Sequence, residues 1–178
     1  MKVRAGRPTD CPRVNTLMGK LIDEIYAGES EKVRRILKAN YTEEGLKEMC
    51  SEPQTRMFVV TADRKTVGFL FGWLFHNVFT VYWIYVEKPY RGKGAVRELL
   101  SHAEEQLRNL GCYKLEMYAY AENNRFLNFC QKLGFQKGVL IQKSMFGFKI
   151  RNIHKYIGEC GPEDRIKTIK IVGEAGQG

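Results

Sequence analysis

The residues best suited to chemistry form one short loop, 87–94, between an apolar strand-like segment and a helical one. Glycine has no Cβ, so Gly92 and Gly94 allow the backbone to approach a ligand closely. The first amides of the following helix lack an intrahelical partner and carry the positive end of the helix dipole. Arg91 and Lys93 add positive charge beside them. This arrangement predicts a site for the phosphates of an anionic ligand.

Two common phosphate-binding motifs do not fit this loop. A Walker A loop needs a lysine followed by serine or threonine, whereas Lys93 is followed by Gly94. A dinucleotide-binding fingerprint needs a further glycine three residues after Gly94, where the chain has Arg97. The predicted phosphate site therefore belongs to another class.

The loop and a second segment together resemble the GNAT superfamily of N-acetyltransferases. Residues 86–94, followed by a leucine-bearing amphipathic helix, resemble motif A of that family, Q/R-x-x-G-x-G/A. Residues 123–135, Asn-Asn-Arg-Phe-Leu-Asn-Phe-Cys-Gln-Lys-Leu-Gly-Phe, resemble motif B, N-x-x-A-x-x-x-Y-x-K-x-G-F. The opening segment 7–12 with its helix is also similar to a GNAT start. The resemblance extends over roughly residues 2–148, with both motifs in the family's order and separation.

The resemblance implies an α/β (α+β) fold with a mixed, mostly antiparallel central sheet flanked by helices. In this fold two strands splay apart and form the cofactor cleft. The implied co-substrate is acetyl-CoA (coenzyme A), with no metal. The residues that the resemblance assigns to it are Ile84, Tyr85 and Val86 along the pantetheine arm, Arg91, Gly92, Lys93, Gly94, Ala95, Val96 and Arg97 around the diphosphate, and Asn123 on the other side of the arm.

Proton transfer is the step at which the chain departs most from the family pattern. The acceptor amine must lose a proton, and the leaving thiolate must gain one. The motif B tyrosine, the family's usual acid, is Cys130 here; a thiol is acidic enough to donate, but a packing role is the alternative. Glu116 and Tyr118 share one face of a predicted strand and are candidate bases, Tyr118 through an ordered water. Bulk water acting through a proton wire is the alternative to both.

The elements that position these residues follow from hydrophobic spacing and turn signals. Three aromatic residues in the strand before the loop, Tyr82, Trp83 and Tyr85, suit either a cationic acceptor or the core. We assign residues 1–150 to a GNAT acetyltransferase domain and 151–178 to a C-terminal extension with a hairpin of 154–160 and 165–172 and a frayed end. The predicted strands are 2–6, 57–62, 67–75, 78–86, 113–120 and an extended segment 139–148. The first predicted helix is capped by Thr9 or Asp10, has its apolar stripe over 14–25 and is stopped by Gly28. The other predicted helices are a stretch around 33–37, 42–50, 95–109 and 123–133.

Composition narrows the class of protein further. The chain has 178 residues, of which 44% are hydrophobic, enough for one globular domain. Its five cysteines are scattered without Cys-x-x-Cys spacing, which favours reduced thiols in a cytoplasmic protein over disulfides or zinc. There is no apolar signal core and no membrane-spanning segment, so no membrane partner is expected.

The sequence thus predicts an acetyl-CoA-dependent N-acetyltransferase that transfers an acetyl group directly to an amine. The acceptor is a small amine or polyamine, or a protein amino group. The alternative is a catalytically degenerate GNAT domain that senses acyl-CoA or binds nucleic acid through its basic tail, an alternative that the net charge of +9 leaves open. A homodimer formed through the tail hairpin is a further expectation.

Overall fold

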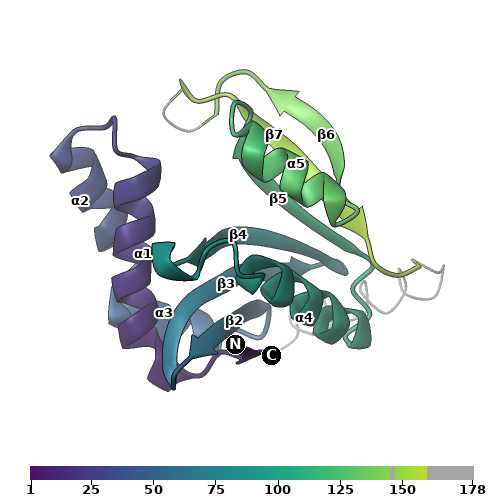
Figure 1. Ribbon diagram of the computed structural model, residues 1–178, viewed down its shortest axis with the longest axis horizontal. Coiled ribbons are helices and arrows are strands. Elements are labelled where there is room, and N and C mark those ends of the chain that lie inside the picture. The colour runs from purple at the N-terminus through teal and green to yellow at the C-terminus, as the bar shows by residue number, and fades with distance from the viewer. Residues whose placement is uncertain (145–146, 160–178) are drawn as a thin grey trace, which may run out of the picture. The chain divides into compact units, whose positions relative to one another are not determined.

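The computed structural model describes residues 1–144 and 147–159, and the chain divides into two compact units (Figure 1). Residues 1–72 and 83–103 form the first unit; residues 73–82 and the described residues from 104 onward form the second. A seven-stranded sheet has the strand order β1-β2-β3-β4-β5-β7-β6. This mixed, mostly antiparallel sheet with flanking helices confirms the predicted fold class.

The first unit begins with β1 (Lys2–Ala5), a short 3-10 turn and three helices, α1 (Cys11–Ile25), α2 (Glu31–Ala39) and α3 (Glu43–Ser51). Helix α1 buries the apolar stripe that its sequence predicts. The hydroxyls of Ser30 and Thr42 accept hydrogen bonds from the first turns of α2 and α3, so both helices begin at side-chain caps.

Two tight turns organise the strands that follow: β2 (Thr55–Ala62), β3 (Lys65–Phe75) and β4 (Val78–Val86). Each turn has two residues with positive φ, Asp63 (49°) and Arg64 (62°) in the first, His76 (47°) and Asn77 (62°) in the second. Such turns match the twist of hairpin strands, and they fall in the gaps between the predicted strands, at 63–66 and 76–77. Strand β1 extends the sheet by pairing antiparallel with β2.

The second unit contains β5 (Lys114–Tyr120), α5 (Asn124–Lys132), β6 (Gln136–Ile141) and β7 (Ile150–Tyr156). Strand β5 runs parallel to the start of β4, with Val78 opposite Lys114 and Val81 opposite Met117. It runs antiparallel to β7, which also pairs antiparallel with β6. Helix α4 (Ala95–Asn109), like β3 and β4, has residues in both units.

The extended segment predicted at 139–148 is shifted in the structure. Strand β6 starts at Gln136 because Gly134, with a φ of 88°, ends α5 abruptly, and it stops at Ile141. Strand β7 begins at Ile150 and pairs with β5 along one edge and with β6 along the other, so residues 150–156 belong to the sheet. The predicted hairpin partner 165–172 lies outside the described residues, and the extent of the extension stays a prediction.

Candidate functional site

The loop between β4 and α4 has the open backbone that its sequence predicts. Gly92 and Gly94 have φ values of +76° and +87°, a left-handed conformation that disfavours any residue with a Cβ. A Cβ added at either position would meet nothing within 4 Å. These glycines are thus needed for the path of the backbone, and the space beside them is open.

The head of α4 presents unpaired amides. Its first helical hydrogen bond runs from the Glu98 N–H to the Gly94 carbonyl, at 3.0 Å. The N–H groups of Ala95, Val96 and Arg97 precede that bond and have no partner further back in the helix. Ala95 is buried whereas Val96 is only half-buried, so Ala95 is the first residue of α4 whose side chain lies in the core. Three amides and the helix dipole are therefore directed at one place.

Arg91 joins this loop to helix α1. Its Nε donates a hydrogen bond of 2.7 Å to the Val86 carbonyl, and its terminal nitrogen donates one of 2.7 Å to Glu24. The guanidinium carbon also lies 5.1 Å from the centre of the Tyr85 ring. An anion bound at the loop would compete with Glu24 for this arginine. Sequence analysis did not single out Glu24, because its separation of 67 residues from Arg91 hides the contact.

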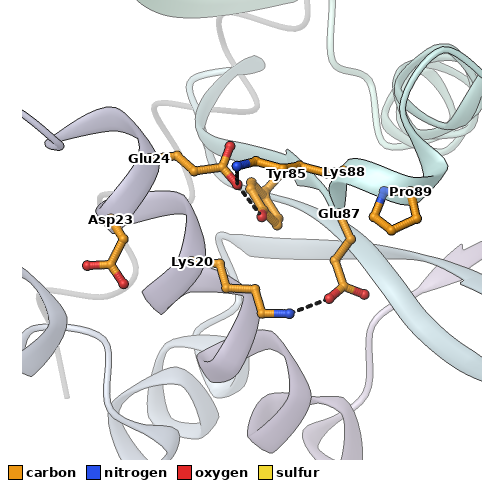
Figure 2. Close-up of a pocket in the computed structure, with 7 residues that line it drawn as sticks. All are labelled: Lys20, Asp23, Glu24, Tyr85, Glu87, Lys88 and Pro89. Atoms are coloured by element: carbon orange, nitrogen blue, oxygen red, sulfur yellow. Dashed lines mark hydrogen bonds and ion pairs between the residues drawn. The ribbon is translucent and has the colours of Figure 1, made fainter.

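Tyr85 and Glu24 form the polar centre of this contact (Figure 2). The Tyr85 hydroxyl donates a hydrogen bond of 2.9 Å to Glu24. Burial raises the pKa of Glu24, but hydrogen bonds from Arg91 and Tyr85 outweigh it, so this pKa lies below its usual value. Burial and the bond to Glu24 raise the pKa of Tyr85 to about 12. Glu24 therefore stays ionised and Tyr85 stays protonated at neutral pH.

A pocket of about 430 Å³ lies between α1 and the end of β4 (Figure 2). Within it, Glu87 accepts hydrogen bonds of 2.5 Å from Lys20 and from Arg13. Burial raises the pKa of Glu87, but these two cations outweigh it and hold the pKa below normal. The pocket thus offers charges of both signs beside the loop. Its lining residues are Lys20, Asp23, Glu24, Tyr85, Glu87, Lys88 and Pro89.

The predicted arm-binding segment of β4 is partly occupied by contacts within the chain. The Val86 carbonyl accepts from Arg91, and Tyr85 is buried. The neighbouring Trp83 makes an edge contact with Tyr41, with ring centres 5.8 Å apart. Its indole Nε1 is buried and has no hydrogen-bond partner among the described residues. This N–H is a donor that a ligand beside β4 could satisfy.

The other predicted site residues lie in the second unit. Asn123 caps α5, since its side-chain oxygen accepts from the Phe126 N–H at 3.2 Å. Cys130 is fully buried in α5, and burial raises the pKa of its thiol to about 12. A thiol in this state favours the packing interpretation over the acid interpretation.

Glu116 and Tyr118 share one face of β5, as their spacing predicts. Glu116 accepts hydrogen bonds from Lys114 at 2.8 Å and from the Thr80 hydroxyl at 3.3 Å, whereas the Tyr118 side chain is half exposed. The hydrogen bond that Lys114 donates to Glu116 raises the pKa of Lys114, which therefore remains charged. His154 lies directly opposite Glu116 on β7. Sequence analysis missed this histidine, because only the strand register brings it beside Glu116.

Comparisons with known proteins agree with this geometry. The chain matches the acetyltransferase (GNAT) family over residues 21–135, more than half of its length. The chain therefore belongs to the GNAT acetyltransferase family. No curated protein matches the sequence significantly.

Several solved structures share the fold at low sequence identity. PaiA N-acetyltransferase from Thermoplasma acidophilum, solved with coenzyme A, is 20% identical with a TM-score of 0.73, and the match covers 87% of this chain and 98% of that one. Ribosomal-protein-S18-alanine N-acetyltransferase from Escherichia coli is 17% identical with a TM-score of 0.69, covering 90% and 96%. An aminoglycoside 6'-N-acetyltransferase complexed with coenzyme A is 13% identical with a TM-score of 0.67, covering 90% and 99%.

None of the helices in the described part of the chain has the length and apolarity that crossing a bilayer requires.

Proposed function

We propose that this protein is an acetyl-CoA-dependent N-acetyltransferase that transfers the acetyl group directly to an amine. The observation that carries the proposal is the open left-handed turn at Gly92 and Gly94, followed by the unpaired amides of α4. Both sequence motifs of the family occur in the family's order along the chain, and two similar structures were solved with coenzyme A. The proposed diphosphate ligands are the amides of residues 92–97, with Arg91 beside them.

The fit of this loop to a diphosphate rests on space and charge. With no atom within 4 Å of a Cβ built at Gly92 or Gly94, ligand oxygens can approach the main chain. Arg91 is held by Glu24 in the free protein, so we expect it to exchange this carboxylate for a phosphate on binding. Ile84, Tyr85 and Val86 would contact the pantetheine arm, as would Asn123. Acetyl-CoA supplies an activated thioester to the reaction.

The residues of β5 are proposed to handle the acceptor proton. The amine must be neutral to attack, and a base within hydrogen-bond reach, or one water away, can accept its proton. The Glu116 carboxylate already accepts hydrogen bonds from Lys114 and from the Thr80 hydroxyl, so it is engaged within the chain. Tyr118, half exposed on the same face, is the better candidate, acting through water. The pH–rate profiles of Tyr118→Phe and Glu116→Gln test this order.

Cys130 is assigned a packing role in this proposal. Its pKa of about 12 lies well above the value of about 8.5 for an ordinary thiol, so Cys130 is a poor proton donor to a departing thiolate. We therefore assign Cys130 to the packing of α5 and expect solvent or Tyr118 to supply the proton. This departure from the family tyrosine is also the observation that favours the second candidate function, an acyl-CoA sensor without turnover.

One experiment separates the two functions. Calorimetry and thermal shift with acetyl-CoA test binding, and thiol release across a panel of amines tests turnover. Binding together with amine-dependent release is the result we expect. Binding without release from any amine would favour the sensor, and no binding of acetyl-CoA or free coenzyme A would contradict both functions.

A further inference from the structure

The second unit exposes an unusual set of rings. Five aromatic side chains in the described part of the chain are more than a third exposed, with exposed fractions from 45% to 61%. All five belong to strands of the second unit. They are Trp73 and Phe75 on β3, Tyr82 on β4, Tyr118 on β5 and Tyr156 on β7.

Strand register places these rings on one face of the sheet. Thr80 is opposite Glu116, which is opposite His154, and Lys114 is opposite Tyr156, so these residues point to the same side. Tyr118 follows Glu116 by two residues on the same strand, so its side chain points to this side as well. In the tight hairpin at His76-Asn77, the alternation of exposed and buried residues gives Trp73 and Phe75 the same face as Thr80. We call this surface the aromatic face.

The opposite side of the same strands is closed by helices. Phe79, Leu115, Met117 and Ile153 are buried there. Lys155, which alternates with His154 on β7, donates two hydrogen bonds of 2.7–2.8 Å to Glu104 on α4. The aromatic face is therefore on the side of these strands opposite to α4, and in the described part of the chain its rings are exposed rather than used as core.

The charges on the aromatic face limit what it can bind. Its lysine and its glutamate, Lys114 and Glu116, form an ion pair 2.8 Å apart with each other. A nucleic acid requires cations that are free to neutralise phosphates, and a polyamine requires free carboxylates. Neither is available among the described charged residues of this face. Exposed rings around an ion pair that is already satisfied are instead typical of a surface that binds polypeptide, because aromatic residues are enriched at such interfaces.

We propose that the aromatic face binds a polypeptide acceptor, whose amino group lies beside Tyr118 and Glu116 while the following residues lie across β3, β4, β5 and β7. The inference rests on the proposed function, since Tyr118 and Glu116 belong both to this face and to the candidate proton-transfer groups. Three strand spacings from Trp73 to Tyr156 span about 14 Å. An extended chain covers that distance with about four residues.

The test compares acceptors of different length. Two equimolar sequence-randomised peptide libraries with free amino termini, one of dipeptides and one of octapeptides, serve as acceptors with acetyl-CoA, and thiol release is measured. We expect kcat/KM for octapeptides to exceed that for dipeptides at least tenfold. In the double variant Trp73→Ala, Phe75→Ala this ratio should fall below three, with the dipeptide rate unchanged.

The control is Leu110→Ala, a side chain as exposed as these rings but located after α4 and outside the aromatic face; it should keep the wild-type ratio. Equal rates for both libraries, or an equal loss for both in the double variant, would overturn the inference. So would a wild-type dimer, measured by light scattering, that the double variant converts to monomer, because the face would then bind a second copy. Failure of the proposed function is distinct, since it would abolish acetyl-CoA binding or thiol release with every amine.

Discussion

Gly94→Ala tests whether the left-handed turn before α4 serves only the chain or also a ligand. With a φ of +87° and nothing within 4 Å of the added Cβ, alanine meets no clash in the free protein. The left-handed conformation costs a residue with a Cβ roughly 1–2 kcal/mol, partly offset by about 0.4–1 kcal/mol from a stiffer unfolded chain. We expect a net loss of about 1 kcal/mol, or about 2–4 °C in Tm.

Gly111→Ala is the matched control at the other end of the same helix. Gly111 follows α4 with a φ of +76°, and a Cβ built there also meets nothing within 4 Å. Its N–H bonds the Arg108 carbonyl at 3.0 Å, so its role is to end the helix. The two variants should lose similar stability for the same conformational reason, which separates backbone strain from ligand binding.

Coenzyme A then distinguishes the two glycines. At 100 times the wild-type Kd, bound ligand should stabilise the wild type and Gly111→Ala by about 2.7 kcal/mol. A methyl group at Gly94 would meet the diphosphate, and we expect affinity to fall at least tenfold, which reduces the gain to about 1.4 kcal/mol or less at the same concentration. Thermal shift gives the gain, and calorimetry gives the Kd directly.

Two results would refute this reasoning. Full coenzyme A stabilisation of Gly94→Ala would show that the glycine serves the turn alone. Equal loss of affinity in Gly94→Ala and Gly111→Ala would show that affinity follows general stability rather than contact with the loop.

Three further predictions concern buried groups. Cys130→Ala should lose about 1 kcal/mol of stability and keep kcat within twofold; a tenfold loss of kcat at unchanged coenzyme A affinity would restore its acid role. Trp83→Phe removes an unpaired buried N–H, so the free energy of unfolding measured with urea should stay the same or rise. If a bound ligand accepts a hydrogen bond from this N–H, kcat/KM should fall three- to tenfold. An unchanged kcat/KM would exclude Trp83 from the site. The folded pKa values of Glu24 and Glu87 lie below the unfolded value of about 4.3, so the stability they add is present above that pH and is lost as pH falls through the folded values. Glu87→Gln should therefore lower Tm at pH 7 and flatten its decline between pH 5 and 3, and an unchanged decline would contradict the assignment.

The sequence predicted the elements around the loop closely, for a physical reason. Strand β4 and helix α4 have the predicted bounds because their signals are local: a run of apolar and aromatic residues, two glycines in a turn, and a helical apolar stripe. The turns at 63–64 and 76–77 are also local in origin. Strand β7 was harder to place, because its pairing partners lie on β5 and β6 and not beside it in the sequence.

The candidate site was only partly predictable. Motif spacing identified the glycines and Arg91, but the contact of Arg91 with Glu24 and Tyr85 depends on how α1 packs within the first unit. Burial of Cys130 also lies beyond the sequence, since the same thiol would have an ordinary pKa on a surface. Long-range packing therefore decides which motif residues are available for chemistry.

Backbone amide signals followed by NMR during a coenzyme A titration test the central claim most directly. The proposal predicts that the amides of Gly92, Gly94, Ala95 and Val96 shift most and gain protection from hydrogen exchange, while that of Gly111 does not change. Saturable binding that leaves the head of α4 unperturbed, or no binding at all, would contradict it.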